Sequence, residues 1–294
     1  MLGIVMLIGM VSYPCCFTTG AVEVMERDNI LTFTVLCVFY AWTPGVDTKM
    51  VSLPLHGLKS NIPLNMAPDS VDDSYKGCEK KMFRKVRDYY LQTERLNNKD
   101  FNQAWTDAEA RYKPNKALSK NYSLAIQVYV TEYSQMYKSF NEATRTQKKN
   151  YSTTFKYHSL HFLLTNALRI LNTNNKRFQT FRGTNLSFHG VRNTEMRFGQ
   201  FISSSLDKKI AGERFGTRSC FEITTYFGAQ LWGYSQMAHE REVLIPPYEV
   251  FKITKVMQKK DKKDLWCDVV YKLESTKKGK SNLKCQMVGP HQGE

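Results

Sequence analysis

The sequence predicts an α+β fold in which helices come first and strands follow. Residues 78–171 are rich in helix formers, and apolar side chains recur there at three- and four-residue spacing. From residue 178 onward the chain changes to short segments of alternating apolar and polar residues, many of them β-branched or aromatic. A run of helices followed by a run of strands is typical of the α+β class with antiparallel sheets.

The clearest helix is expected from residue 158 onward, where one apolar stripe is formed by Leu160, Leu163, Leu164, Ala167, Leu168 and Leu171. Two histidines, His158 and His161, lie on the same helix, and in such a position they are expected to be packed residues rather than ligands. Strands are expected at residues 221–225, 243–245, 248–256 and 265–273.

At 294 residues the chain is long enough for one domain with a sizeable core. Its formal net charge of +15 would by itself suggest an anionic partner. The basic residues are spread along the chain, however, and the two densest clusters, residues 255–263 and 277–284, are typical of a solvated hairpin tip and a tail. Because no recognised binding motif accompanies the charge, nucleic acid is not expected as a partner.

The first 47 residues are expected to be a leader outside the fold. Two apolar stretches, residues 2–11 and 30–42, are shorter than the roughly 20 residues of a membrane span and resemble signal-peptide cores. The second follows Met25, so a start at Met25 would give a signal peptide of conventional length. We therefore expect no stable membrane span and divide the chain into a leader (1–47), a short linker (48–61), a folded domain (62–288) and a tail (289–294).

Two carboxylates, Glu240 and Glu242, lie two residues apart just before a short apolar run and a double proline. In an extended segment, residues i and i+2 project to the same face. Both side chains are therefore expected to converge on one ligand, while Arg241 points away. Such a pair can stabilise a cation and accept a proton.

Upstream of this pair stand Thr180-Phe-Arg-Gly183 and Gly199-Gln-Phe-Ile-Ser-Ser-Ser205. An arginine, a serine triplet on a strand and Glu-x-Glu, in this order, resemble the signature of the vertebrate arginine-specific mono-ADP-ribosyltransferases. Further segments resemble the opening segment, central helix and catalytic strand of that family, at residues 65–78, 158–168 and 242–251. The resemblance covers about residues 62–288, which makes this stretch the expected catalytic domain.

The resemblance implies two packed antiparallel sheets that form an NAD-binding cleft, with the helical half beside it. It also implies an enzyme that transfers ADP-ribose from NAD or NADP, as co-substrate, to the guanidino group of arginine with release of nicotinamide. No cofactor is expected to be bound permanently. In this reading Glu242 hydrogen-bonds the ribose 2′-hydroxyl and favours an oxocarbenium-like sugar, while Glu240 meets the incoming guanidinium as a bidentate acceptor.

The other site residues are also implied by the resemblance. Arg182 is expected to bind the nicotinamide-side phosphate, Gly183 to let the backbone approach the carboxamide, and Ser203 to position the ribose and Glu242. Lining positions of the dinucleotide site in relatives match Gln200, Ser235 and Tyr122, and Phe215 is expected to stack on the nicotinamide. A metal site is not expected, since no Cys-x-x-Cys or paired-histidine spacing occurs.

Four cysteines remain outside the leader, and by themselves they permit three pairings: Cys78, Cys220, Cys267 and Cys285. In the family a bridge ties the start of the domain to its end, which maps onto Cys78 and Cys285 and leaves Cys220 with Cys267. Disulfides indicate an oxidising compartment. Asn-x-Ser sequons agree with a secreted or lumenal protein, at Asn121, Asn150 and Asn185.

Two other functions stay open. An NAD glycohydrolase would use water in place of arginine, and glutamine rather than glutamate at position 240 would favour it. A catalytically idle surface or secreted binding protein would be favoured by loss of Arg182, Ser203 or Glu242, all of which are present. The polar C-terminal residues lack the hydrophobic tail of a GPI signal. We therefore expect secretion or retention in the secretory lumen, a monomer, and arginine side chains of extracellular or lumenal proteins as acceptors.

Overall fold

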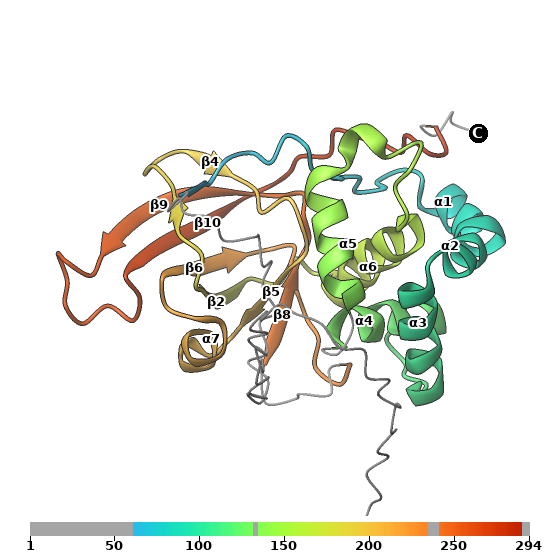
Figure 1. Cartoon of the computed structure of the whole chain (residues 1–294), viewed down its shortest axis with the longest axis horizontal. Helices are drawn as coiled ribbons and strands as arrows, with labels where there is room; N and C mark the ends of the chain where they lie inside the picture. Colours follow the sequence, from blue (N-terminus) through green and yellow to red (C-terminus); the bar gives the residue numbers. More distant parts are fainter. Residues whose placement is uncertain (1–60, 132–134, 235–240, 290–294) are drawn as a thin grey trace, which may run out of the picture. The chain divides into compact units, whose positions relative to one another are not determined.

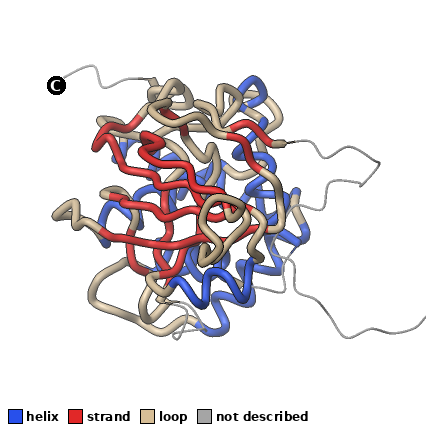
Figure 2. Tube along the Cα trace, turned by 90° about the vertical axis from the view of Figure 1, so that its left-hand side faces the viewer, coloured by secondary structure: helices blue, strands red, loops and turns tan. Residues whose placement is uncertain are grey.

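A computed structural model of the chain describes residues 61–289, apart from 132–134 and 235–240. The expected leader, most of the linker and the end of the tail lie outside these residues. Within them a helical part is followed by a strand part, so the α+β class is confirmed. Figure 1 shows α1 to α6 gathered on one side of the strands. In the view of Figure 2 the strands lie in front of the helices.

The helical part begins with α1 (Glu79–Lys85), a π-helical turn (Val86–Tyr90) and α2 (Leu91–Asn97), which follow one another directly. Asn98 then caps the next helix, because its side chain accepts a hydrogen bond from the amide of Phe101. The remaining helices are α3 (Lys99–Arg111), α4 (Lys120–Val130), α5 (Gln135–Thr146), a 3-10 turn (Lys148–Asn150), α6 (His158–Leu171) and α7 (Lys208–Phe215).

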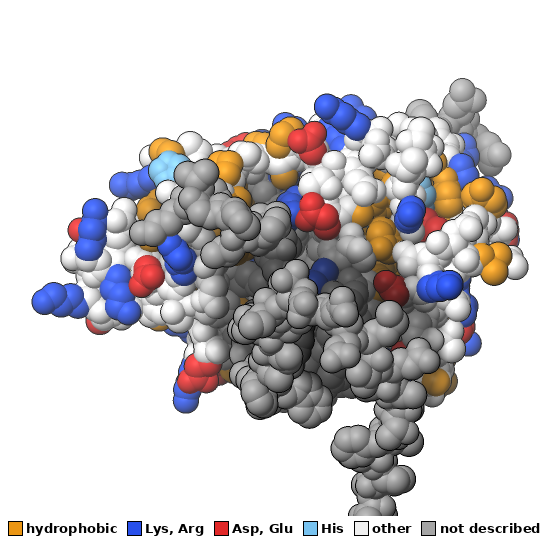
Figure 3. Space-filling view, in the orientation of Figure 1, with side chains coloured by type: hydrophobic (Ala, Val, Ile, Leu, Met, Phe, Trp, Pro, Cys, Tyr) orange, Lys and Arg blue, Asp and Glu red, His pale blue; other side chains and the backbone are white. Residues whose placement is uncertain are grey.

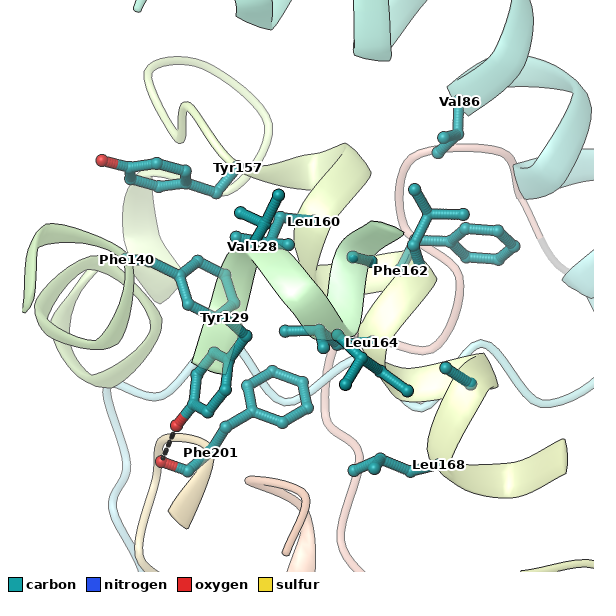
Figure 4. Packing of buried hydrophobic residues seen from close by; sticks show 14 of the residues in the cluster. Val86, Val128, Tyr129, Phe140, Tyr157, Leu160, Phe162, Leu164, Leu168 and Phe201 are labelled. Atoms are coloured by element: carbon teal, nitrogen blue, oxygen red, sulfur yellow. Dashed lines mark hydrogen bonds between the residues drawn. The ribbon is translucent and has the colours of Figure 1, made fainter. Parts of the chain in front are cut away.

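Helix α6 is the centre of the helical part, since every side chain from His158 to Leu168 is buried. Figure 4 shows Leu160 of α6 beside Val128 of α4, with Leu164 one turn further along α6. His161 is a packed residue as predicted: its Nε2 lies 2.9 Å from the Val71 carbonyl and its Nδ1 lies 2.8 Å from the Tyr75 hydroxyl. Burial lowers the pKa of His158 to about 3 and that of His161 to about 4.

A carboxylate from α2 caps the first turn of α6. Glu94 accepts hydrogen bonds from the amides of His158 (2.6 Å) and Ser159 (2.9 Å), and from the Ser159 hydroxyl. These orphan amides need an acceptor, and a negative charge there also suits the helix dipole. Burial nevertheless raises the pKa of Glu94 from 4.5 to about 7, because the cost of desolvating the carboxylate exceeds the gain from the three hydrogen bonds.

We expect Glu94→Gln to change the dependence of stability on pH between about 4.5 and 7, because it removes a contribution that falls as the pH rises. The folded state holds the Glu94 proton more tightly than the unfolded state does. The stability contributed by this group is therefore complete below pH 4.5 and is lost as the pH rises through about 7. His158 and His161 act in the opposite sense, since their lowered pKa values remove stability as the pH falls below 6.5. The difference in unfolding free energy between wild type and variant, measured by urea titration at several pH values, isolates Glu94; a constant difference would contradict the assignment.

The strand part forms one sheet of eight described strands in the order β4-β9-β10-β6-β2-β5-β8-β7. Its pairings are antiparallel, except that β6 and β10 run parallel. A separate two-stranded parallel sheet joins β1 (Ile62–Pro63) and β3 (Phe188–His189). The strands of the large sheet are β2 (Phe178–Thr184), β4 (Glu195–Met196), β5 (Ile202–Ser205), β6 (Ser219–Thr225), β7 (Ala229–Gln230), β8 (Glu242–Ile245), β9 (Glu249–Gln258) and β10 (Val269–Gly279).

The expected pair of purely antiparallel sheets is therefore replaced by one mixed sheet. The physical reason lies between β2 and β5, which share a single residue pair, Phe181 with Ser205. On one side of this junction β2 pairs with β6 over seven residues, and on the other β5 pairs with β8 over four. The sheet thus consists of two halves that are joined at one pair and diverge beyond it.

The basic cluster at residues 255–263 lies at the tip of the β9–β10 hairpin, as predicted. Figure 3 shows Lys and Arg side chains at this end of the strand part. The second cluster does not belong wholly to a tail, because β10 continues to Gly279. The bridge between Cys220 and Cys267 ties the start of β6 to the segment before β10 and is one of the two expected disulfides.

The first and last described segments are tied together near the second disulfide, Cys78–Cys285, which confirms that pairing. Asp72 and Arg197 form an ion pair at 2.7 Å, and both side chains are fully buried. Arg197 also donates to the carbonyls of Met66 and Lys280, while Asp72 accepts from the amide of Asn282. Both charges are therefore compensated and hydrogen-bonded, which is the condition for burying them.

We expect Asp72→Ala to lower the free energy of unfolding by about 3–5 kcal/mol, because it leaves the Arg197 guanidinium buried without a counter-charge. Asp88→Ala is the matched control, since Asp88 pairs with Arg87 at the surface, where an ion pair contributes little. Urea unfolding of both variants with the disulfides intact measures the difference. Equal stability of the two variants would show that the buried pair is not structural.

Candidate active site

The three signature residues lie on neighbouring strands at the junction of the two sheet halves. Arg182 is on β2, Ser203 on β5 and Glu242 on β8. In the β5–β8 register Ser203 stands opposite Leu244, and Ser205 stands opposite Glu242. Because side chains alternate along a strand, Ser203, Ser205 and Glu242 share one face of the sheet. That face also carries Leu244, which belongs to the core shared with the helices.

Arg182 is held in place by the neighbouring strand. Its Nη1 donates a hydrogen bond of 2.5 Å to the Ser203 carbonyl, and only 9% of the residue is exposed. Its guanidinium carbon lies 5.9 Å from the centre of the Phe215 ring, at the end of α7. The bond to Ser203 fixes the guanidinium across the junction and engages one of its five N–H donors.

Glu242 is a buried carboxylate, with 7% of the residue exposed. None of the residues that the structure describes forms a hydrogen bond or ion pair with its side chain. Its charge also affects Tyr129 of α4. Burial raises the pKa of the Tyr129 hydroxyl well above its ordinary value, and the negative charge of Glu242 acts in the same direction. A carboxylate that is largely withdrawn from water favours a ligand that brings a compensating group.

A cavity of about 480 Å³ lies between α5 and the sheet junction. Arg182 and Gln200 line it from the strand side, and α5 contributes Tyr137, Asn141 and Arg145. Arg145 Nη1 lies 3.4 Å from Gln200 Oε1, so the two walls meet through this pair. Arginine side chains on both walls make the cavity suitable for an anionic ligand that also has polar and aromatic parts.

The α5 residues were missed by sequence reasoning. Tyr137, Asn141 and Arg145 are spaced by four residues, which places them on one face of the helix. The spacing is visible in the sequence, but it does not indicate whether this face meets a ligand, the core or solvent.

The structure brings some of the expected dinucleotide-binding residues together and not others. Gln200 lines the cavity, and Phe215 adjoins Arg182. Tyr122 does not line the cavity; its ring packs against Phe83 of α1, with the ring centres 6.0 Å apart. Glu240 and Ser235 lie outside the described residues.

Two local features of the structure bear on the expectations for the Glu240–Glu242 segment and for Gly183. Arg241 has a φ of +48°, so the chain before β8 is not a regular extended segment, and the shared face of Glu240 and Glu242 does not follow from strand geometry. Gly183 has a packing reason to be glycine: a Cβ there would lie 2.2 Å from the Gly216 carbonyl oxygen and 2.5 Å from that of Ala211. The absence of a side chain thus lets α7 approach β2.

The described part of the chain contains neither a metal-binding cluster nor a membrane-spanning helix. Over residues 61–289, outside the two gaps, His, Cys, Asp and Glu side chains form no group of three that could hold a metal ion. In the same residues, no helix has the length and apolar character needed to cross a bilayer.

Arg182 is buried and lines the cavity, while Glu242 is a buried carboxylate two strands away and, like Ser203, is not among the residues that line it. A cation for phosphates and a carboxylate for a developing positive charge are the groups that glycosyl transfer requires. The family model of the NAD:arginine ADP-ribosyltransferases matches residues 64–278. Human ecto-ADP-ribosyltransferase 5 is 34% identical over 228 residues, which cover 70% of this chain and 78% of the human protein. The mouse GPI-linked NAD(P)(+)-arginine ADP-ribosyltransferase 1 is 32% identical over 246 residues, covering 75% of this chain and 74% of the mouse protein.

Solved structures agree with these relatives. The crystal structure of the eukaryotic mono-ADP-ribosyltransferase ART2.2 has a TM-score of 0.64 and 33% identity to this chain, and covers 76% of this chain and 98% of its own. A mutant of ART2.2 in complex with NADH has a TM-score of 0.65 at 32% identity, with the same coverage. The chain therefore belongs to the NAD:arginine ADP-ribosyltransferase family.

Proposed function

We propose that this chain is an enzyme that transfers ADP-ribose from NAD, or NADP, to the guanidino group of arginine and releases nicotinamide. The observation that carries the proposal is the placement of Arg182, Ser203 and Glu242 on three adjacent strands; Arg182 also lines a cavity together with Arg145, whereas Ser203 and Glu242 do not line it. We place the catalytic domain at residues 62–288.

In the proposed mechanism the chain first holds the dinucleotide. Arg182 takes the nicotinamide-side phosphate, and Arg145 on the opposite wall offers a second cation to the pyrophosphate. Fixing the phosphates from two sides orients the ribose before reaction, which removes part of the entropic cost of the reaction. Phe215, next to Arg182, offers an aromatic face to the nicotinamide.

The two carboxylates, Glu242 and Glu240, have different roles in the reaction. Breaking the bond between nicotinamide and ribose leaves positive charge on the sugar, and Glu242 stabilises this charge while it holds the 2′-hydroxyl. Ser203 lies diagonally across from Glu242 in the β5–β8 register, within reach of the same ribose. Glu240 pairs with the incoming guanidinium and accepts its proton. Water in place of the guanidinium gives hydrolysis, the second activity of the same site.

The human relative is named an ecto-ADP-ribosyltransferase, which supports a site outside the cytosol. The two disulfides agree with an oxidising compartment. We propose that the protein acts as a secreted or lumenal monomer on arginine side chains of extracellular or lumenal proteins.

The proposal is tested with purified protein, labelled NAD and agmatine, a small guanidinium acceptor. The matched control is putrescine, which has a primary amine in place of the guanidinium. We expect an ADP-ribosyl adduct with agmatine only, and an amount of nicotinamide equal to the sum of adduct and free ADP-ribose. Free ADP-ribose without any adduct would make the enzyme a glycohydrolase, and no release of nicotinamide in either mixture would make it an idle member of the family.

A further inference from the structure

One buried polar group in the cavity lacks a partner. Asn141 of α5 lines the cavity and is 2% exposed. Its Oδ1 is buried, and no described residue donates a hydrogen bond to it. Buried side-chain acceptors are nearly always satisfied in native proteins, so this oxygen calls for an explanation.

The orientation of the Asn141 amide is fixed by its neighbours. The Tyr129 hydroxyl donates its single hydrogen to the Phe201 carbonyl at 3.0 Å, which Figure 4 shows as a dashed line. Toward Asn141 the hydroxyl can then only accept, and it does so from Nδ2 at 3.3 Å. A flipped amide would set two acceptors against each other. Nδ2 is therefore committed to Tyr129, and Oδ1 is the atom that remains.

The surroundings of Asn141 narrow the class of group that could bind Oδ1. An amide oxygen has no proton to donate, so it repels phosphate oxygens and favours an O–H or N–H. In the same cavity Arg145 and Arg182 provide the cations that phosphates require. The cavity thus offers cations for the charged part of a dinucleotide, and its wall contains one neutral acceptor, Asn141 Oδ1, which is closed to water in this structure and which an uncharged donor reaches through a small side-chain movement.

We propose that Asn141 Oδ1 accepts a hydrogen bond from a neutral O–H or N–H group of the bound dinucleotide, which is a ribose hydroxyl or an amide or amino group. The inference rests on the proposed function, since it supposes that this cavity receives NAD. Helix α5 then orients the substrate through Asn141 and also contributes the cation of Arg145. Tyr129 is the positioning residue that keeps the acceptor in the required orientation.

The test compares Asn141→Leu with Asn141→Ala in the full chain. Leucine fills the same volume without an acceptor and leaves the substrate donor unpaired, so the KM for NAD is expected to rise about 5- to 100-fold with kcat little changed. Alanine leaves room for a water that replaces part of the hydrogen bond, so its KM is expected to lie between those of wild type and the leucine variant. For stability the two variants should rank the other way, with the leucine variant the more stable. Leucine replaces an unpaired buried oxygen, whereas alanine leaves a void, so the melting temperature of the alanine variant is expected to be the lower of the two.

A role in packing alone would make the alanine variant worse in both measurements, and this outcome, or an unchanged KM in both variants, would overturn the inference. Thr165→Val is the matched control, because Thr165 Oγ1 on α6 is also buried and unpaired but does not line the cavity; the KM of this variant should equal that of wild type.

Titration of the Asn141 variants with ADP-ribose locates the donor on the ligand. If the variants lose affinity equally for NAD and for ADP-ribose, the donor lies in the ADP-ribose part; if they lose affinity for NAD alone, it is the carboxamide. A wild-type chain that binds neither compound would overturn the proposed function together with this inference.

Discussion

Replacing Glu242 by glutamine is expected to lower both ADP-ribose transfer and NAD cleavage by about 10²–10³-fold while the fold stays intact. Glutamine has nearly the same shape, so the substitution removes the charge that faces the developing cation and little else. Both reactions pass through the same sugar cation, so both should fall together. The burial of Glu242 and its lack of a partner among the described residues make this charge available to the substrate.

Initial rates with labelled NAD, with and without agmatine, measure this effect. Glu274→Gln is a suitable control, because Glu274 is an exposed residue of β10 that hydrogen-bonds Thr224 away from the cavity. The melting temperature of each variant separates loss of chemistry from loss of folding. Near-normal turnover of a folded Glu242→Gln protein would remove Glu242 from the mechanism.

Replacing Glu240 by glutamine is expected to separate the two reactions. Glu242, Ser203 and Arg182 would still hold NAD and stabilise the sugar cation, whereas the incoming guanidinium would lose its ionic partner. Transfer to arginine should therefore fall further than NAD cleavage, by about 2–5 kcal/mol in transition-state stabilisation. Water then becomes the main acceptor.

The quantity to measure is the ratio of agmatine adduct to free ADP-ribose. Arg241→Gln serves as the control, since Arg241 lies between the two carboxylates in the sequence and is exposed to solvent. Its ratio should match that of wild type. A parallel fall of both activities in Glu240→Gln would assign this residue to the ribose or to the fold instead of to arginine recognition.

Local sequence patterns predicted much of the fold because they reflect local physics. The apolar stripe of α6 appears as an entirely buried helix, and the β9–β10 hairpin follows the alternation of its residues. Arg182, Ser203 and Glu242 could be expected to meet because three strands in the known family order bring them together.

The remaining features depend on contacts between distant segments. The single Phe181–Ser205 pair leaves no periodic signal, so one sheet could not be distinguished from two. Tyr122 and Tyr137 both precede the strand part on helices, and only the packing of α5 over the junction determines which of them lines the cavity. The packing requirement for Gly183 likewise arises from α7, which follows it in the sequence by more than twenty residues.

The narrow junction between β2 and β5 has a consequence for the motion of the protein. Among the described residues, one backbone pair and the Arg182 side chain join the strands there, so relative motion of the halves breaks few backbone hydrogen bonds and is resisted mainly by the apolar core that Ile202 and Ile245 share with Phe221 and Phe251. The proposed phosphate contact lies on one half, and the carboxylate that faces the ribose lies on the other. A dinucleotide held by both would act as an additional cross-link. Amide hydrogen exchange along β5 and β8 should then slow when NAD is bound, while exchange at residues 259–268, the tip of the β9–β10 hairpin at the far end of the strand part, should stay as it is.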